Sequence, residues 1–157
     1  GALWDIGPYA VHTLRQVMNA KVKQVMAKSK LNSHQADLTT SGIIEFTNEA
    51  RATFDISFEC IRRSEFEVFG DKGRMKCHTV WQHEDDEAVV TMELDGSNPV
   101  IEKIQKGNHF DLEINHFVDC ILNNNESDKL SFTDAVNQAA TMEAIYQSIQ
   151  KSQWVSV

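Results

Sequence analysis

Alternation of apolar and polar side chains at period two is the feature that most limits the folds open to this chain of 157 residues. Residues 51–59 read RATFDISFE, and the apolar members are Ala52, Phe54, Ile56 and Phe58. Ile44 and Phe46 show the same alternation just upstream. Because successive side chains of a strand point to opposite faces, the pattern predicts two strands, each with one apolar and one polar face. Asn48-Glu49 between them predicts a hairpin turn.

The pattern returns twice further along the chain. Phe66 and Val68 alternate with acidic residues, Gly-Asp-Lys-Gly at 70–73 predicts a turn, and Met75 and Cys77 continue beyond it. Residues 87–94, EAVVTMEL, predict another strand. Strands joined in this way form an antiparallel sheet, which can leave one face in water. The aromatic side chains expected on the packed face are Phe54, Phe58, Phe66 and Trp81.

Helical patterns flank the strands. Proline suits the first turn of a helix, so a helix is expected after Gly7-Pro8, ending near Asn19. A 3.6-residue stripe runs from Phe110 to Ile121, and Ser131 with Asp134 resembles the N-cap of a last helix. The order helix, strands, helices predicts an α+β domain: an open, largely antiparallel sheet with helices on one face and the other face available for dimerisation.

Composition narrows the function classes. Lysine and arginine total 15 against 23 acidic residues, a formal charge of −8, which disfavours nucleic acid and anionic membranes as partners. No apolar run is long enough to span a membrane. Cys60, Cys77 and Cys120 are odd in number and lack C-x-x-C spacing, so we expect reduced thiols in a cytoplasmic protein. His78, His83 and the acidic residues 84–86 gather at a predicted hairpin tip, where charges are usually solvated, so no metal site is expected.

The opening stretch carries the candidate chemistry. On a helix beginning near Asp5, the side chains of Asp5, Tyr9 and His12 share one side. A carboxylate, a phenol and an imidazole at that spacing could surround one hydroxyl or carbonyl oxygen and move its proton. Spacing alone leaves other interpretations open: Asp5 as a helix cap, Tyr9 as a core aromatic with a wet hydroxyl, and His12 on the surface.

The segment GALWDIGPYAVHTLRQVM resembles the start of the C-terminal domain of the glucose–fructose oxidoreductase, inositol dehydrogenase and MocA family. In order, GIIEFTNEARATFDISF resembles the family's sheet hairpin, and FEVFGDKGRMKC resembles its hydrophobic-Gly-x-x-Gly strand pair. EINHFVDCILNN and AVNQAATMEAIYQSIQKSQWVSV resemble its closing helices and tail. In this order the pieces extend along the chain from residue 1 to residue 157.

The resemblance implies that residues 1–157 are a substrate-binding and dimerisation domain, preceded in the full-length protein by a Rossmann domain that binds NAD or NADP. Neither G-x-G-x-x-G nor Glu-Lys-Pro, the segment of the family's catalytic lysine, occurs in the sequence. We therefore expect no bound cofactor and no dehydrogenase activity in this chain alone. The implied substrate is a sugar, cyclitol or related polyol, and the implied partner is a second copy of the chain, bound through the open sheet face.

The resemblance also assigns roles to residues. Asp5 stands at the family's catalytic aspartate, which helps to position the substrate and the lysine, and Tyr9 stands where the family has histidine or tyrosine at the reacting oxygen. His12 stands where the family often has aspartate or asparagine, and it either lines the substrate site or lies on the surface. Gly7 either allows close backbone approach to the substrate or only marks the start of the helix. The alternative function is a non-catalytic ligand-binding or dimer-scaffold module of the same fold.

Overall fold

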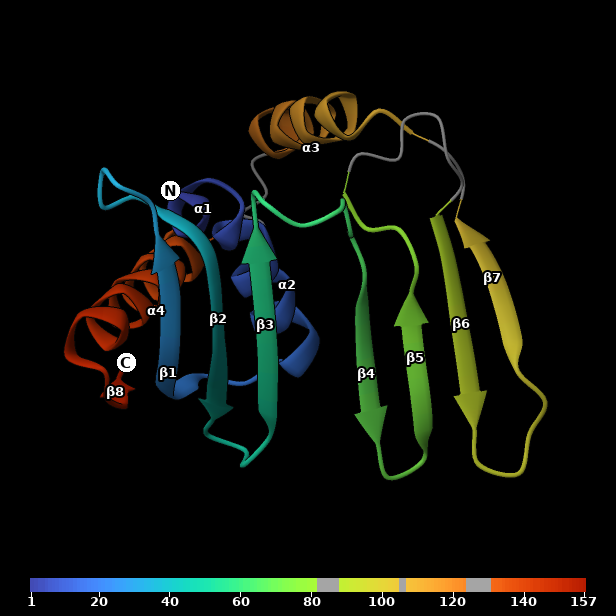
Figure 1. Cartoon of the computed structure of the whole chain (residues 1–157). Helices are drawn as coiled ribbons and strands as arrows, with labels where there is room; N and C mark the ends of the chain where they lie inside the picture. Colours follow the sequence, from blue (N-terminus) through green and yellow to red (C-terminus); the bar gives the residue numbers. More distant parts are fainter. Residues whose placement is uncertain (82–87, 105–106, 124–130) are drawn as a thin grey trace. The chain divides into compact units, whose positions relative to one another are not determined.

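The computed structural model describes residues 1–81, 88–104, 107–123 and 131–157, which fall into two compact units (Figure 1). The first unit combines Gly1–Cys60 with Ser127–Val157, and the second is Ile61–Glu126. Each unit carries an open antiparallel sheet of four strands, so the predicted α+β class is confirmed. The described strands form two sheets where the sequence predicted one.

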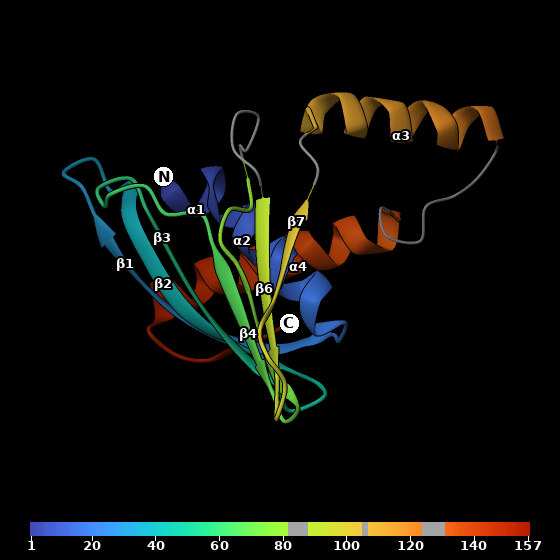
Figure 2. The ribbon, with the colours of Figure 1, turned by 90° about the vertical axis from the view of Figure 1, so that its right-hand side faces the viewer.

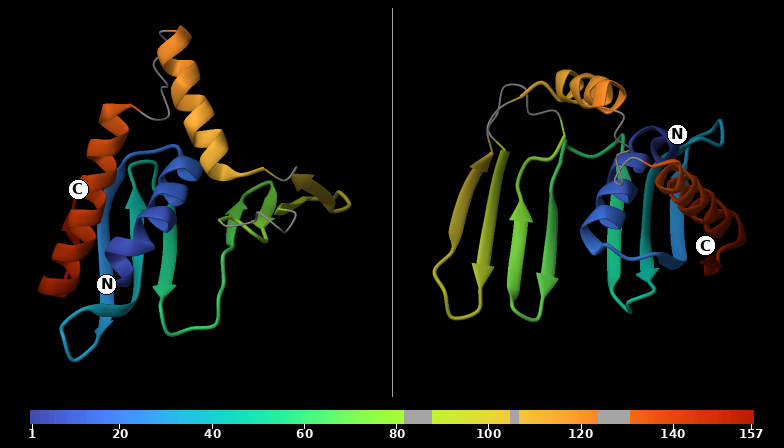
Figure 3. Two further views of the ribbon diagram at one scale, coloured as in Figure 1. Left: turned by 90° about the horizontal axis from the view of Figure 1, so that it is seen from above. Right: turned by 180° about the vertical axis from the view of Figure 1, so that it is seen from behind.

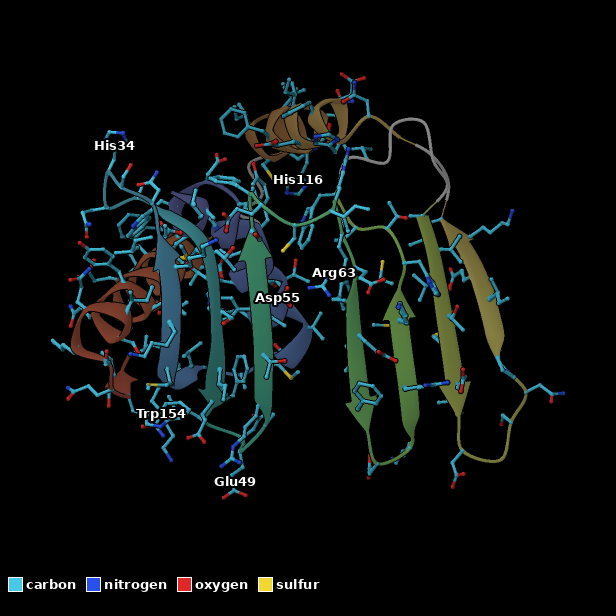
Figure 4. The ribbon with its side chains drawn as sticks, in the orientation of Figure 1. His34, Glu49, Asp55, Arg63, His116 and Trp154 are labelled. Carbon is cyan, nitrogen blue, oxygen red and sulfur yellow. The ribbon has the colours of Figure 1, made fainter. Side chains whose placement is uncertain are left out.

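The sheet of the first unit contains β1 (Val22–Leu31), β2 (Asp37–Phe46), β3 (Arg51–Ser57) and β8 (Val155–Ser156). Its order is β3-β2-β1-β8, and every pairing is antiparallel. The predicted hairpin turn between β2 and β3 is confirmed, with Glu49 at a φ of 69°. Figure 4 shows Glu49 at this turn and His34 at the opposite end of the sheet.

Three helices cover one face of this sheet: α1 (Ala2–Asp5), α2 (Gly7–Met18) and α4 (Phe132–Lys151). Figures 2 and 3 show all three on the same side of β1, β2 and β3. The strand side chains on that side form the core with the helices, and they include Val25, Ala27, Ile44, Phe46, Ala52, Phe54 and Ile56. The period-two pattern thus predicted the packed face of this sheet correctly, Phe54 included. Phe58 was wrongly expected there, because it lies beyond the end of β3 and is 50% exposed. Phe66 belongs to the sheet of the second unit and Trp81 lies outside the described strands, so neither is in this core.

The opposite face of the sheet is polar, as the alternation predicted. Thr53 and Asp55 of β3 are exposed, between buried neighbours on the same strand. Thr39 Oγ1 and Ser57 Oγ lie 2.7 Å apart in a hydrogen bond across β2 and β3. Figure 4 labels Asp55 on β3.

Ser148 joins α4 to the sheet at the point where β8 stops pairing with β1. Its hydroxyl accepts the backbone N–H of Ala27 at 3.0 Å and donates to the backbone carbonyl of Gln153 at 2.6 Å. The strand β8 pairs with β1 only at Gln24 and Val25. A fully buried side chain therefore satisfies a strand N–H at the sheet edge.

The second unit contains β4 (Phe66–Gly70), β5 (Gly73–Cys77), β6 (Ala88–Leu94), β7 (Val100–Ile104) and the helix α3 (His109–Asn123). The strands pair in chain order, all antiparallel. The first three strands and α3 were predicted. The sequence interpretation missed β7. Its sequence, VIEKI, does not alternate between apolar and polar residues, and all five residues are exposed.

Both ends of the last helix agree with the sequence. Ser131 Oγ accepts the backbone N–H of Asp134 at 3.2 Å, which confirms the predicted N-cap. After α4 the chain ends with the short strand β8, Val155–Ser156. Among the described helices, none has both the length and the apolar character that crossing a bilayer requires.

Candidate functional site

The candidate residues at the start of the chain lie on two helices, and a single helix beginning near Asp5 was a wrong expectation. Asp5 is the last residue of α1, Ile6 separates the helices, and α2 begins at Gly7 with Pro8 in its first turn. The sequence interpretation missed α1 because four residues are too few to show a helical period. Asn19, in the left-handed conformation, ends α2 as predicted.

The position of α1 is fixed by burial and by an acid from β2. Ala2 and Leu3 are buried in the core. Asp37 Oδ2 accepts the backbone N–H of Leu3 at 2.6 Å and the hydroxyl of Thr40 at 3.1 Å. Because a charged acceptor binds an orphan helix N–H strongly, Asp37 anchors the short helix that carries Asp5. Sequence gave no signal for this contact, whose partners are 34 residues apart.

Gly7 is buried between the helices and the sheet. A Cβ atom at this position would lie 3.0 Å from Cδ1 of Ile56 and 3.3 Å from Cδ1 of Leu3. Close packing against the core accounts for glycine here. The predicted contact of Gly7 with substrate is not tested by this packing and stays a prediction.

Tyr9 and His12 lie one turn apart on α2, where side chains three residues apart are neighbours. Tyr9 is 57% exposed, so it is not a core aromatic residue. Asp5 is also exposed, and no side chain caps α2, whose N-cap is Ile6. The three groups are therefore accessible at the surface of the first unit, a carboxylate on α1 and a phenol and an imidazole on α2.

His12 and Arg15 meet Asp134 of α4. The Nη2 atom of Arg15 donates to Asp134 Oδ1 at 2.7 Å, and Nδ1 of His12 lies 3.8 Å from Asp134 Oδ2. Gln138, one turn after Asp134, donates through Nε2 to the backbone carbonyl of Pro8 at 3.0 Å. These contacts tie the first turns of α4 to the whole length of α2. The sequence singled out Asp134 only for the helix cap, because its partners are more than 100 residues away.

A second polar group lies on the face of the sheet away from the helices. Gln24, Glu45 and Arg51 form a chain across β1, β2 and β3, with 2.9 Å between Arg51 Nε and Glu45 Oε1. The hydrogen bond from Gln24, and then the charge of Arg51, holds the pKa of the Glu45 carboxyl below its usual value. With Ile43 and Trp154 these residues line an open hollow of about 330 Å³. Figure 4 labels Trp154.

Metal ligands and thiols give no further site within the described ranges. No group of three or more potential ligands was found there, and His78 Nε2 lies 2.9 Å from the hydroxyl of Thr91. Residues 83–86 of the discounted cluster lie outside the described residues. Cys60, Cys77 and Cys120 are free thiols.

A family model described as "Oxidoreductase family, C-terminal alpha/beta domain" matches residues 1–157 of the chain. A comparison with curated proteins gave no match. Among solved structures, an aldose–aldose oxidoreductase from Caulobacter crescentus, complexed with glycerol, superimposes with a TM-score of 0.88 at 20% identity. That match covers 100% of this chain and 48% of the other.

KijD10, a 3-ketoreductase from Actinomadura kijaniata solved with TDP-benzene and NADP, matches with a TM-score of 0.83 at 19% identity. The match covers 94% of this chain and 47% of the KijD10 chain. At these identities the likeness shows the fold. The chain spans about half the length of the solved structures that it matches.

Proposed function

The chain belongs to the oxidoreductase family whose C-terminal alpha/beta domain it matches from end to end, and on that premise we propose that it binds the substrate of an NAD(P)-dependent oxidoreductase. The proposed substrate is a sugar, a cyclitol or a related polyol. The observation that carries the proposal is the family match over all 157 residues. The accessible carboxylate and phenol at the start of the chain add the chemistry that a polyol site needs.

Asp5 and Tyr9 are the proposed catalytic residues. The carboxylate of Asp5 would bind and orient a substrate hydroxyl, and the hydroxyl of Tyr9 would exchange a proton with the reacting oxygen. A phenol, with a typical pKa of about 10, is a poor base at neutral pH unless a cation favours its ionised form. We propose that a lysine from a preceding domain supplies that cation. His12 and Gly7 are proposed to contact the substrate.

The proposed cofactor is NAD or NADP, which supplies the hydride chemistry when bound. The sequence contains no G-x-G-x-x-G loop that would cradle its phosphates. We therefore assign cofactor binding to a preceding nucleotide-binding domain and expect this chain alone to be inactive. We propose that this domain contacts the exposed apolar side chains of α1, α2 and α4, which are Trp4, Tyr9, Phe132 and Val136.

The polar face of the β1–β3 sheet is the proposed contact between two copies of the chain. Thr53 and Asp55 are exposed on this face, and a two-fold interface would bring the same face of both copies together. Size-exclusion chromatography with light scattering is expected to report a dimer for the wild type. Replacing Thr53 and Asp55 by arginine should yield a monomer with an unchanged circular dichroism spectrum. We also place the protein in the cytoplasm, in keeping with its three free thiols.

The test of the enzyme function is an absorbance assay at 340 nm on the protein with its nucleotide-binding domain. A panel of aldoses, ketoses, myo-inositol and glycerol is supplied with NAD⁺ or NADP⁺. The proposal expects NAD⁺ or NADP⁺ to be reduced in the presence of at least one polyol. It expects no reduction of either when residues 1–157 are assayed alone. Binding of a polyol without turnover would favour the alternative of a non-catalytic ligand-binding module, and dimerisation without binding would favour a dimer scaffold.

A further inference from the structure

Asp134, near the start of α4, presents its two carboxylate oxygens to different partners on α2. Oδ1 accepts from Arg15 at 2.7 Å and from Gln16 Nε2 at 3.3 Å. Oδ2 faces Nδ1 of His12 at 3.8 Å. Oδ1 therefore accepts from two side chains, and Oδ2 lies near one ring nitrogen of His12.

The surroundings hold this carboxylate in one orientation. The side chain of Arg15 is only 9% exposed, and its Nη1 also donates to Gln138 Oε1 at 2.8 Å. The backbone N–H of Asp134 donates to Ser131 Oγ, so the residue is fixed at the N-cap turn as well. A buried guanidinium that lost its partner would be costly, which makes rotation of the carboxylate unfavourable.

A fixed carboxylate beside Nδ1 determines which ring nitrogen of a neutral His12 carries the proton. The partner of one ring nitrogen decides which nitrogen carries the proton of the neutral ring. With Asp134 accepting from Nδ1–H, the Nε2 atom becomes an acceptor on the opposite edge of the ring. The side chain of His12 is 41% exposed, and the present 3.8 Å is longer than a hydrogen bond, so the contact requires the ring to turn toward Asp134. Tyr9 lies one turn earlier on the same helix.

We propose that Asp134 is a positioning residue that holds His12 with Nε2 outward, so that this nitrogen accepts a hydrogen bond from a substrate hydroxyl beside Tyr9. The role rests on the function proposed above and deepens it, because it makes His12 a specificity contact for a hydroxylated substrate. In the competing account, Asp134 only joins α4 to α2 through Arg15, and His12 is a bystander. The two accounts differ in the tautomer of His12.

The first measurement is long-range ¹H–¹⁵N correlation NMR of the histidine rings in the 157-residue chain at pH 8.5. His12 is assigned by comparison with a His12→Asn variant. The wild type is expected to show mainly the Nδ1–H tautomer for His12, and Asp134→Asn is expected to move the population toward Nε2–H. Glu143→Gln is the matched control, because it removes one acid from the same helix nine residues away, where Glu143 accepts only from Gln147 among the contacts described.

A wild-type His12 already in the Nε2–H form would overturn the proposal, and so would an equal tautomer shift in both variants. The wild-type spectrum decides the matter even if Asp134→Asn fails to fold.

The second measurement separates this inference from the proposed function. In the protein with its nucleotide-binding domain, Asp134→Asn is expected to raise KM for the polyol about three- to tenfold, the range for one misaligned hydrogen bond, with kcat nearly unchanged. Glu143→Gln should leave both constants unchanged. An unchanged KM together with a changed tautomer would overturn the substrate contact of His12. Absence of turnover in the wild type would contradict the proposed function, while the NMR measurement would still decide the geometry.

Discussion

Some positions in this fold leave room for only one residue type, and Gly42 is the clearest case. A Cβ atom there would lie 2.7 Å from the backbone carbonyl oxygen of Met26 and 2.8 Å from Cε1 of Phe54. The Phe54 ring lies over the glycine on the neighbouring strand and is 7% exposed. The strand pairing thus depends on a missing side chain, as well as on the alternating residues around it.

Gly42→Ala is expected to lower the free energy of unfolding by about 1–3 kcal/mol, because a backbone oxygen cannot move aside as a flexible side chain can. The control is Ser41→Ala, an exposed position next to it on β2, expected to stay within about 0.5 kcal/mol of the wild type. Urea unfolding followed by circular dichroism measures both. Equal midpoints for the two variants would show that the sheet has room at Gly42.

The thiols should differ in reactivity. Burial raises the pKa of the Cys77 thiol above its ordinary value, whereas Cys60 is exposed to solvent. A raised pKa means less thiolate at neutral pH, and the thiolate is the nucleophile. Alkylation of Cys77 by iodoacetamide at pH 7.5 should therefore be slower than that of Cys60, and its rate should still be rising above pH 9. Peptide mass spectrometry measures both rates, with the urea-unfolded chain as control; equal rates in the folded chain would contradict the assignment.

At the residue scale, local chemistry was predictable and distant contacts were not. The cap at Ser131 and the turn at Glu49 follow from neighbouring residues, and both are present. The anchoring roles of Asp37 and Asp134 depend on partners far along the chain, which a sequence pattern does not reveal. The exposure of Tyr9 also depends on how α2 packs, and spacing alone could not decide it.

Elements with a clear apolar period were predicted well, and elements without one were missed. The paired strands β2 and β3, and the helices α2, α3 and α4, have clear apolar patterns. The four-residue α1 shows no period, and β7 has no buried face from which a period could arise. The apolar period predicted α3 even though none of its residues is buried, whereas α1 and β7 have no period in their sequences from which they could be predicted.

The N-cap of α4 gives a prediction at this scale. Ser131→Ala removes the acceptor for the Asp134 N–H and is expected to cost about 1 kcal/mol of stability. Thr133→Ala, an exposed change two residues later in the same turn, serves as the control and should cost nothing. Thermal unfolding followed by circular dichroism measures the difference. A Ser131→Ala melting temperature equal to that of the control would mean that packing alone fixes the start of α4.

At the scale of the whole molecule, the two units differ in how much they bury. The hydrophobic core consists of side chains from α1, α2, α4 and β1–β3. In the described part of the second unit, only Cys77 and Ala88 are buried, and α3 has no buried residue. The first unit therefore holds most of the apolar burial on which stability depends.

Hydrogen exchange should reflect this difference. The hydrogen-bonded amides of β1, β2 and β3 are expected to exchange only through global unfolding. Those of β4–β7 are expected to exchange through local opening at a lower free energy, because few buried contacts hold these strands. Exchange followed by mass spectrometry of peptides from each strand measures both, and a dilute denaturant series separates local from global opening. Equal protection in the two sheets would contradict the expected difference in stability.

The proposal that most needs a test is that Tyr9 exchanges a proton with a polyol in an NAD(P)-dependent reaction. The chain offers its own control, since its other tyrosine, Tyr146, lies on α4 with its ring 6.4 Å from that of Trp4. The most direct measurement is kcat for Tyr9→Phe and Tyr146→Phe in the protein with its nucleotide-binding domain. Loss of general acid–base catalysis should lower kcat of Tyr9→Phe by about 100-fold or more, with Tyr146→Phe close to the wild type. A Tyr9→Phe enzyme as fast as the Tyr146→Phe enzyme would contradict the account.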